Sequence, residues 1–158
     1  MKVVNFSVIK TIGILSNPKS EFELKELKEI TKYLNSLGKE TFPIIYCSNE
    51  TIANQNFQGE AWLSLNKKNC NWLGKPIENS KIKHFLDTEF DILFDLSYSA
   101  NFSLNYLFVQ SKALLKVMPT SETSEDFADL MLKVPDVKNK MAYIKHSIHY
   151  LEILNKTP

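Results

Sequence analysis

Three segments near the N-terminus constrain the fold most, because they read as strand, helix and strand within about forty residues. The run from Lys10 to Asn17 is apolar without alternation and stops at a Ser-Asn-Pro turn, which is typical of a strand buried on both faces. A helix is predicted from a cap at Ser20 to about Leu37, and a second strand over 40–47. Such a unit pairs two parallel strands through a right-handed crossover.

The predicted helix carries apolar residues at helical spacing, which indicates one buried face. These residues are Phe22, Leu24, Leu27, Ile30, Leu34 and Leu37. Glu21 and Glu23 suit the positive end of a helix dipole, and Gly38 is suited to end the helix. Pro43 lies inside the second strand and lacks a backbone N–H, so we expect that strand at an edge of the sheet.

The same alternation continues along the rest of the chain. Strands are predicted over 90–96, 112–118 and 128–134, and helices over 80–87, from Ser99 or Asn101 to about 111, and over 137–154. Between them, 49–77 is an irregular, polar insert with two tryptophans, in which 61–65 is either a short strand or a ledge on the sheet.

This pattern predicts an α/β fold with three layers: an open, mostly parallel sheet of about five strands with helices on both faces. Numbered along the chain, the strands are expected in the order 2-1-3-4-5, with the direction of the fifth left open. A length of 158 residues fits one domain over 1–158, and an apolar fraction of 44% supplies its core.

Charge argues against nucleic-acid binding. The chain has 19 basic and 18 acidic residues, and every basic one is lysine. Binding to nucleic acid needs a concentrated basic face, and bidentate recognition of phosphate needs arginine. The lack of arginine also fits an AT-rich genome.

Targeting signals and disulfide frameworks are not evident. The N-terminus lacks the pattern of a signal peptide, and no run approaches the roughly 20 apolar residues of a membrane span. Two cysteines, Cys47 and Cys70, are too few for a disulfide scaffold. We therefore expect a cytoplasmic protein without membrane contact, with both thiols free.

In open α/β sheets, ligands bind beyond the carboxyl ends of the strands. The candidate ligand-binding residues at those ends are Ser16, Asn17, Lys19, Asp95, Ser97 and Asn101. Each also has a structural interpretation, which we favour: Ser and Asn cap helices, and Asp95 accepts amide hydrogens of its own loop. Asp91 and Asp95 are four residues apart on one strand, about 13 Å, so they cannot form an acid–base pair.

Catalytic and metal-binding patterns are weak. Cys47 follows the second strand, but no histidine is placed beside it by the sequence, so a buried inert thiol is the better interpretation. His146 and His149 have the spacing of a metal clip but no matching carboxylate or cysteine, which indicates surface histidines. We assign no catalytic residue, metal or cofactor.

Several segments resemble a small uncharacterised bacterial family over nearly the whole chain. They are the Thr11-Ile-Gly-Ile-Leu run, the Asn71-Trp-Leu-Gly-Lys-Pro pattern, Phe90-Asp-Ile-Leu-Phe-Asp-Leu-Ser with the following Asn-Phe-Ser-Leu-Asn-Tyr, Ser111-Lys-Ala and Asp129-Leu-Met. The core pattern is also similar to the N-terminal half of heptosyltransferase-type glycosyltransferases. These resemblances imply a Rossmann-like or flavodoxin-like fold, and no activity is carried over from them.

Two hypotheses of function follow. The first is a non-catalytic cytosolic domain that acts through protein–protein contact or as a homo-oligomer, with the tryptophan-bearing insert as contact surface. The second is a protein that binds a nucleotide, a sugar phosphate or a similar small molecule at the strand ends, including a transferase-like enzyme. The sequence favours the first.

Overall fold

In the part of the chain that the structure describes, the sheet has six strands, and every neighbouring pair is parallel. A computed structural model describes residues 5–48, 62–97, 101–120, 128–133 and 139–154. Its strands are β1 (Thr11–Ser16), β2 (Glu40–Tyr46), β3 (Leu63–Leu65), β4 (Ile92–Asp95), β5 (Leu115–Pro119) and β6 (Leu130–Leu132). They lie in the order β3-β2-β1-β4-β5-β6.

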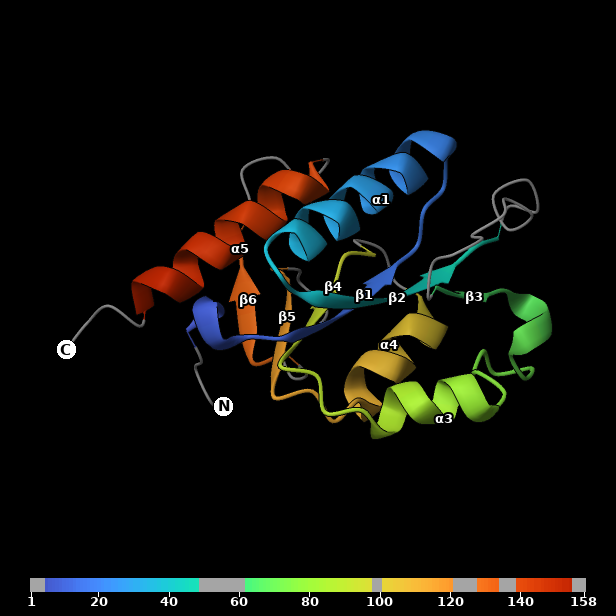
Figure 1. Ribbon diagram of the computed structural model, residues 1–158. Helices are drawn as coiled ribbons and strands as arrows, with labels where there is room; N and C mark the ends of the chain where they lie inside the picture. The colour runs from blue at the N-terminus through green and yellow to red at the C-terminus, as the bar shows by residue number, and fades with distance from the viewer. Residues whose placement is uncertain (1–4, 49–61, 98–100, 121–127, 134–138, 155–158) are drawn as a thin grey trace.

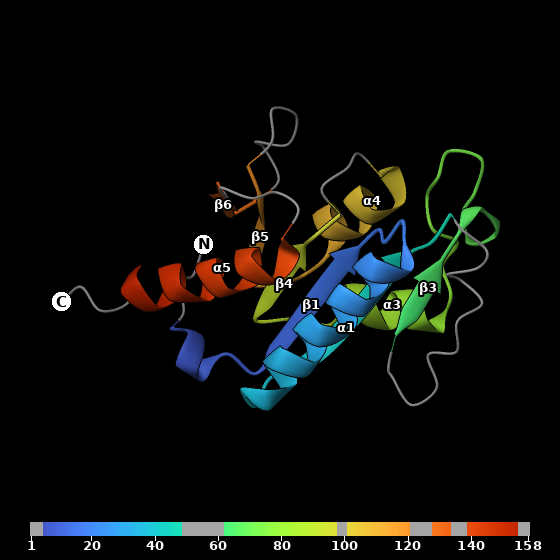
Figure 2. The same ribbon diagram turned by 90° about the horizontal axis from the view of Figure 1, so that it is seen from above.

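Helices cover both faces of this sheet, as predicted. Within the described residues, α1 (Glu21–Ser36) and α5 (Lys140–Leu154) lie on one face, and α3 (Ser80–Asp87) and α4 (Phe102–Gln110) on the other (Figures 1 and 2). Two short 3-10 turns, η1 (Phe6–Val8) and η2 (Lys67–Asn69), complete the elements. This confirms the three-layer α/β fold. None of the described helices has the length and apolarity that crossing a membrane requires.

The predicted strand order is confirmed, but the edge position of the second strand is wrong. β3 forms from 63–65 inside the insert and pairs with β2 on its outer side. The fifth strand, whose direction was open, is β6 and runs parallel to β5. The first part of the insert, 49–61, lies outside the described residues.

Pro43 is tolerated beside β3 because of where its nitrogen faces. Glu40 donates its N–H to Lys10 on the β1 side, at 2.8 Å, and Cys47 donates to Leu65 of β3, also at 2.8 Å. Since alternate residues of a strand face opposite neighbours, Pro43 faces the β3 side with Cys47. Its pairing position is one before the stretch that β3 covers, which begins opposite Ile44.

Two apolar cores lie on the two sides of the sheet. Ile12, Ile14 and Phe94 pack with residues of α1 and α5, and Leu15 and Leu93 pack with residues of α3 and α4. Alternate residues of β1 and β4 are therefore buried on opposite faces, which explains why their sequences are apolar without alternation.

Gly13 is required by packing rather than by backbone conformation. A Cβ atom added there would lie 2.9 Å from Leu93 Cδ1 and 3.2 Å from Phe90 Cδ2. The glycine thus lets these two buried side chains approach β1 closely.

The first predicted helix is confirmed at both ends. Ser20 Oγ accepts a hydrogen bond from Glu23 N at 3.2 Å, and Gly38 follows the helix with a φ of +79°. Phe22 was expected on the buried face but is 75% exposed, because it lies in the first turn before α1 covers the core.

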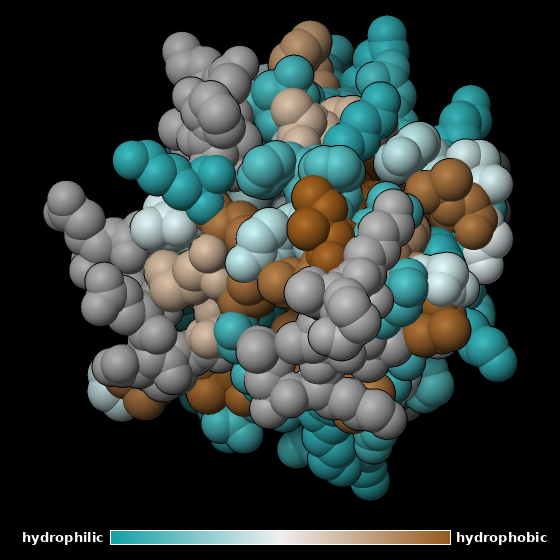
Figure 3. All heavy atoms as spheres, turned by 90° about the vertical axis from the view of Figure 1, so that its left-hand side faces the viewer, coloured by the Kyte–Doolittle hydropathy of each residue, from teal (hydrophilic) through white to brown (hydrophobic). Residues whose placement is uncertain are grey.

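Asp91 joins the starts of β1 and β4. Its Oδ2 accepts hydrogen bonds from Lys10 N at 2.7 Å and from Thr11 N at 3.0 Å. Asp95 lies at the opposite end of β4, so the two carboxylates contact different groups, as their spacing predicts. On the face at the left of Figure 1, apolar side chains lie among hydrophilic ones (Figure 3). In β6, Leu130 and Met131 are half-buried.

Candidate functional site

The carboxyl ends of β1 and β4 are neighbours, so the topology brings the predicted strand-end residues to one edge. Leu15 pairs with Asp95, and Leu96 N donates to Leu15 O at 2.7 Å. Ser16 and Asp95 are both buried, at 1% and 3% exposure. The edge is therefore built of polar groups held away from water.

Asp95 contacts its own loop. Its Oδ1 accepts a hydrogen bond from Ser97 N at 2.9 Å. Burial raises the pKa of this carboxyl, while hydrogen bonds from Ser97 and the charge of Lys140 act in the opposite direction. Asp95 thus acts as the acceptor that shapes the turn after β4, which agrees with its structural interpretation.

Lys140, whose charge acts on Asp95, is a residue that the sequence did not single out. It is the first residue of α5 and only 5% exposed. Burial lowers its pKa, and the negative charges of Glu23, Glu26 and Asp95 oppose that shift. A lysine in the first helical turn opposes the helix dipole, and this mismatch is the signal that points to acidic partners.

Ser16 differs from the other groups at this edge. Its Oγ is buried and has no hydrogen-bond partner, as judged over the described part of the chain. A buried hydroxyl without a partner costs free energy, about 1–3 kcal/mol in mutational data. Contacts among the described residues therefore do not explain the buried hydroxyl of Ser16.

The remaining predicted residues serve mainly the helix starts. Asn101 Oδ1 accepts from Leu104 N at 3.0 Å and caps α4. Lys19 is exposed, and its backbone N–H donates to the Glu23 carboxylate. Asn17, between Ser16 and Lys19 in the chain, is half-buried and is not without a partner.

Cys47 is a buried thiol at the end of β2. Burial raises its pKa, opposed by a hydrogen bond with Ser64. The predicted burial of this thiol is confirmed, and a raised pKa favours the less reactive thiol form.

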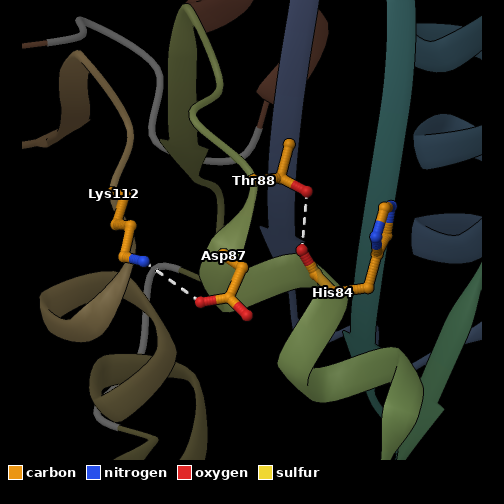
Figure 4. Close-up of polar contacts among 4 residues, drawn as sticks. All are labelled: His84, Asp87, Thr88 and Lys112. Atoms are coloured by element: carbon orange, nitrogen blue, oxygen red, sulfur yellow. Dashed lines mark hydrogen bonds and ion pairs between the residues drawn. The ribbon is translucent and has the colours of Figure 1, made fainter.

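The histidines are all on the surface. Among the described residues, no cluster of histidine, cysteine and carboxylate groups is suited to hold a metal. Figure 4 shows the polar contacts at the end of α3, where His84 and Asp87 lie. There Lys112 Nζ pairs with Asp87 Oδ1 at 3.1 Å, and Thr88 Oγ1 donates to the backbone oxygen of His84 at 2.6 Å. The imidazole points away from both contacts, which therefore only tie the end of α3.

A second candidate site is the loop 71–77, between η2 and α3. Asn71 Oδ1 accepts hydrogen bonds from Leu73 N and Lys75 N, both at 3.0 Å. Gly74 N donates to Asn71 O at 2.9 Å, and Ile77 N donates to Asn69 O at 2.7 Å. The loop is thus closed on itself by its own backbone.

This loop is also fastened to α4. Ser103 Oγ donates to Gly74 O at 2.5 Å, and Cys70 Sγ lies 3.3 Å from the same Ser103 oxygen. Because the single hydroxyl hydrogen of Ser103 goes to Gly74, the Cys70 thiol is the donor in the second contact. A Cβ on Gly74 would come within 3.2 Å of the Phe102 ring, so the loop and the start of α4 are in contact.

The loop presents large apolar side chains to solvent. Trp72 is 90% exposed, and Phe102 beside the loop is 60% exposed. Leu73 and Ile77 are also exposed, and Val109 continues the outer side of α4 two turns after Phe102. We call Trp72, Leu73, Ile77, Phe102 and Val109 the Trp72 surface. The insert was predicted as a contact region, whereas Phe102 and Val109 were not, because an apolar helix reads as buried all round.

A model of a family of unknown function, DUF6913, matches residues 1–154 of the chain. No curated protein and no solved structure matches the chain.

Proposed function

The chain belongs to the DUF6913 family of unknown function, and from there we propose that it is a non-catalytic α/β domain that acts through protein–protein contact. The contact surface in this proposal is the Trp72 surface. The observation that carries it is Trp72, a large aromatic side chain that is 90% exposed on a loop held by its own hydrogen bonds.

Aromatic anchors that are already rigid are the side chains on which protein interfaces depend most. An exposed tryptophan on a pre-ordered loop loses little conformational entropy on binding. The bonds of Asn71 and Ser103 give the loop that order before any partner arrives.

The strand ends support the same proposal. Asp95 and Asn101 are the residues with which a ligand would most naturally be held, and both are used on backbone amides. Lys140 is buried among carboxylates of α1 and β4. These contacts leave few groups at the edge for catalysis.

Site-specific cross-linking tests the proposal. A photoreactive phenylalanine analogue is placed at Phe102 in the source cells, and at Phe22 on α1 as a control that is even more exposed, at 75% against 60%. We expect one discrete protein adduct at position 102 and none at position 22. The Trp72→Ala change should abolish that adduct. Equal adduct patterns at the two positions would contradict the proposal.

A second candidate function is small-molecule binding at the strand ends, and the buried Ser16 hydroxyl is the observation that favours it. The ligand classes are nucleotides, nucleotide-sugars and sugar phosphates, with a transferase-like enzyme included. A thermal-shift panel of these compounds tests it, since binding to the folded state raises the melting temperature with dose. A shift that is lost in Ser16→Ala would support this function, and a flat panel would count against it.

A further inference from the structure

The surroundings of the Trp72 surface are strongly basic. Residues 67–83 contain five lysines and a single acidic residue, Glu78. The lysines are Lys67, Lys68, Lys75, Lys81 and Lys83, and all are exposed. By contrast, α4 itself carries no charged residue. An uncharged apolar centre is therefore bordered by positive charge on the side of η2 and α3.

One of these lysines, Lys75, lies against an aromatic ring of α4. Lys75 Nζ lies 5.3 Å from the centroid of the Tyr106 ring, over the side of α4. A cation over an aromatic face is attracted by the ring quadrupole, so this ammonium group has a preferred place beside the exposed part of α4. Charge and apolar surface thus belong to one patch.

A second copy of this chain does not suit the patch. In a two-fold dimer, the same surface of both copies would meet, so two patches that each carry net positive charge would be brought together. Like charges brought together at an interface cost free energy. The charge distribution instead complements a partner with acidic groups.

On the basis of the function proposed above, we infer that the Trp72 surface binds an acidic protein segment whose apolar side chains contact Trp72 and Phe102 while its carboxylates face Lys67, Lys68 and Lys75. A membrane suits the surface less well, because Asn71 and Asn105 lie exposed among the apolar side chains. The partner is thus defined by aspartate and glutamate beside apolar anchors.

Selection from a random peptide display library tests this inference. Peptides are selected on the wild-type chain and, in parallel, on Trp72→Ala. We expect peptides that are enriched only on the wild type and that are rich in aspartate and glutamate next to aromatic or aliphatic residues. Enriched peptides are then synthesised, and their dissociation constants are measured by fluorescence polarisation.

Three variants divide the contributions. Trp72→Ala should weaken binding by about 30-fold or more, the loss typical of an interface anchor. The triple change Lys67→Glu, Lys68→Glu and Lys75→Glu should weaken binding of acidic peptides and reverse its dependence on salt, because the new carboxylates repel the peptide and salt screens that repulsion. Phe22→Ala, the matched control on α1, should leave binding unchanged.

The outcomes separate the two proposals. Peptides that depend on Trp72 but lack acidic residues, or that bind the triple variant equally well, would overturn the acidic partner and leave the contact surface standing. A selection without any peptide that depends on Trp72 would overturn the contact surface itself. Co-sedimentation with phosphatidylserine vesicles that is lost in Trp72→Ala would replace the protein partner by a membrane.

Discussion

The helices α1 and α4, one from each layer of this fold, bury similar side chains but present different surfaces to solvent. The inner faces of both layers are aliphatic and aromatic and lie on the same six strands. On the outer side of α1, exposed positions such as Lys25, Glu29 and Lys32 are charged, and Phe22 is the exposed apolar residue. On the outer side of α4, they are Phe102, Asn105, Val109 and Gln110.

This difference separates what folding needs from what it does not. Packing on the sheet requires only the inner face of a helix to be apolar, and a charged outer face keeps α1 in water. Nothing in the core explains the apolar outer side of α4. The excess apolar surface is therefore the part of the molecule to be explained by function.

The largest expected effects test whether the two inner faces are equivalent. Leu27 of α1 and Leu107 of α4 are both fully buried. Replacing either by alanine should lower the free energy of unfolding by about 2–5 kcal/mol, through lost burial and the remaining cavity. Urea unfolding measures both losses. A loss below about 1 kcal/mol for Leu107→Ala alone would show that the α3/α4 layer contributes little to the core.

A smaller loss is expected from Gly13→Ala, which acts on the α3/α4 side only. The added methyl group overlaps Leu93 and Phe90, and overpacking costs about 1–3 kcal/mol. The alanine recovers somewhat under 1 kcal/mol by restricting the unfolded chain. Urea unfolding should also show that Leu93→Val relieves part of the cost in the double variant. Strict additivity would contradict the predicted overlap.

The alternation of apolar runs predicted the sheet and the order of its strands, because these follow from local periodicity and turn residues. For α3, the predicted bounds also agree to the residue. For β3, the sequence left a short strand and a ledge as alternatives, because Leu63–Leu65 is only three residues long and lies in a polar insert. Lys140 and Phe102 were missed for another reason. Lys140 is surrounded by residues of α1, and Phe102 contacts the loop 71–77. Contacts between segments that are far apart in the chain leave no local pattern in the sequence.

The pH dependence of stability tests the carboxyl end of β4, where Asp95 is buried. Burial raises the pKa of Asp95 in the folded state, so its contribution to stability is present below the ordinary aspartate value and is lost as pH rises. Asn in its place keeps an acceptor for Ser97 N without the charge. Relative to Asp95→Asn, the wild type should therefore lose stability as pH rises above the ordinary aspartate pKa of about 4.

Urea unfolding of both proteins at several pH values measures this difference, and groups that titrate in both cancel. A difference that grows in favour of the wild type as pH rises would mean that attraction to Lys140 outweighs burial.

The smallest effects are expected on the outer faces. Phe102→Ser on α4 and Phe22→Ser on α1 remove exposed rings, so each should change the free energy of unfolding by no more than about 0.5 kcal/mol. Thermal and urea unfolding measure this. A loss near 2 kcal/mol for Phe102→Ser would assign the ring to the fold, and the contrast between the layers would then have a structural cause.

The central place of β1 has a consequence for the newly made chain on the ribosome. β1 pairs with β4, and the bonds from Lys10 and Thr11 to Asp91 span about eighty residues. At about 5–20 residues per second, translation leaves this side of β1 open for roughly 4 to 16 seconds. During that time, an apolar strand with one unpaired edge is exposed to other nascent chains, so chaperone capture is most useful between the synthesis of β1 and that of β4.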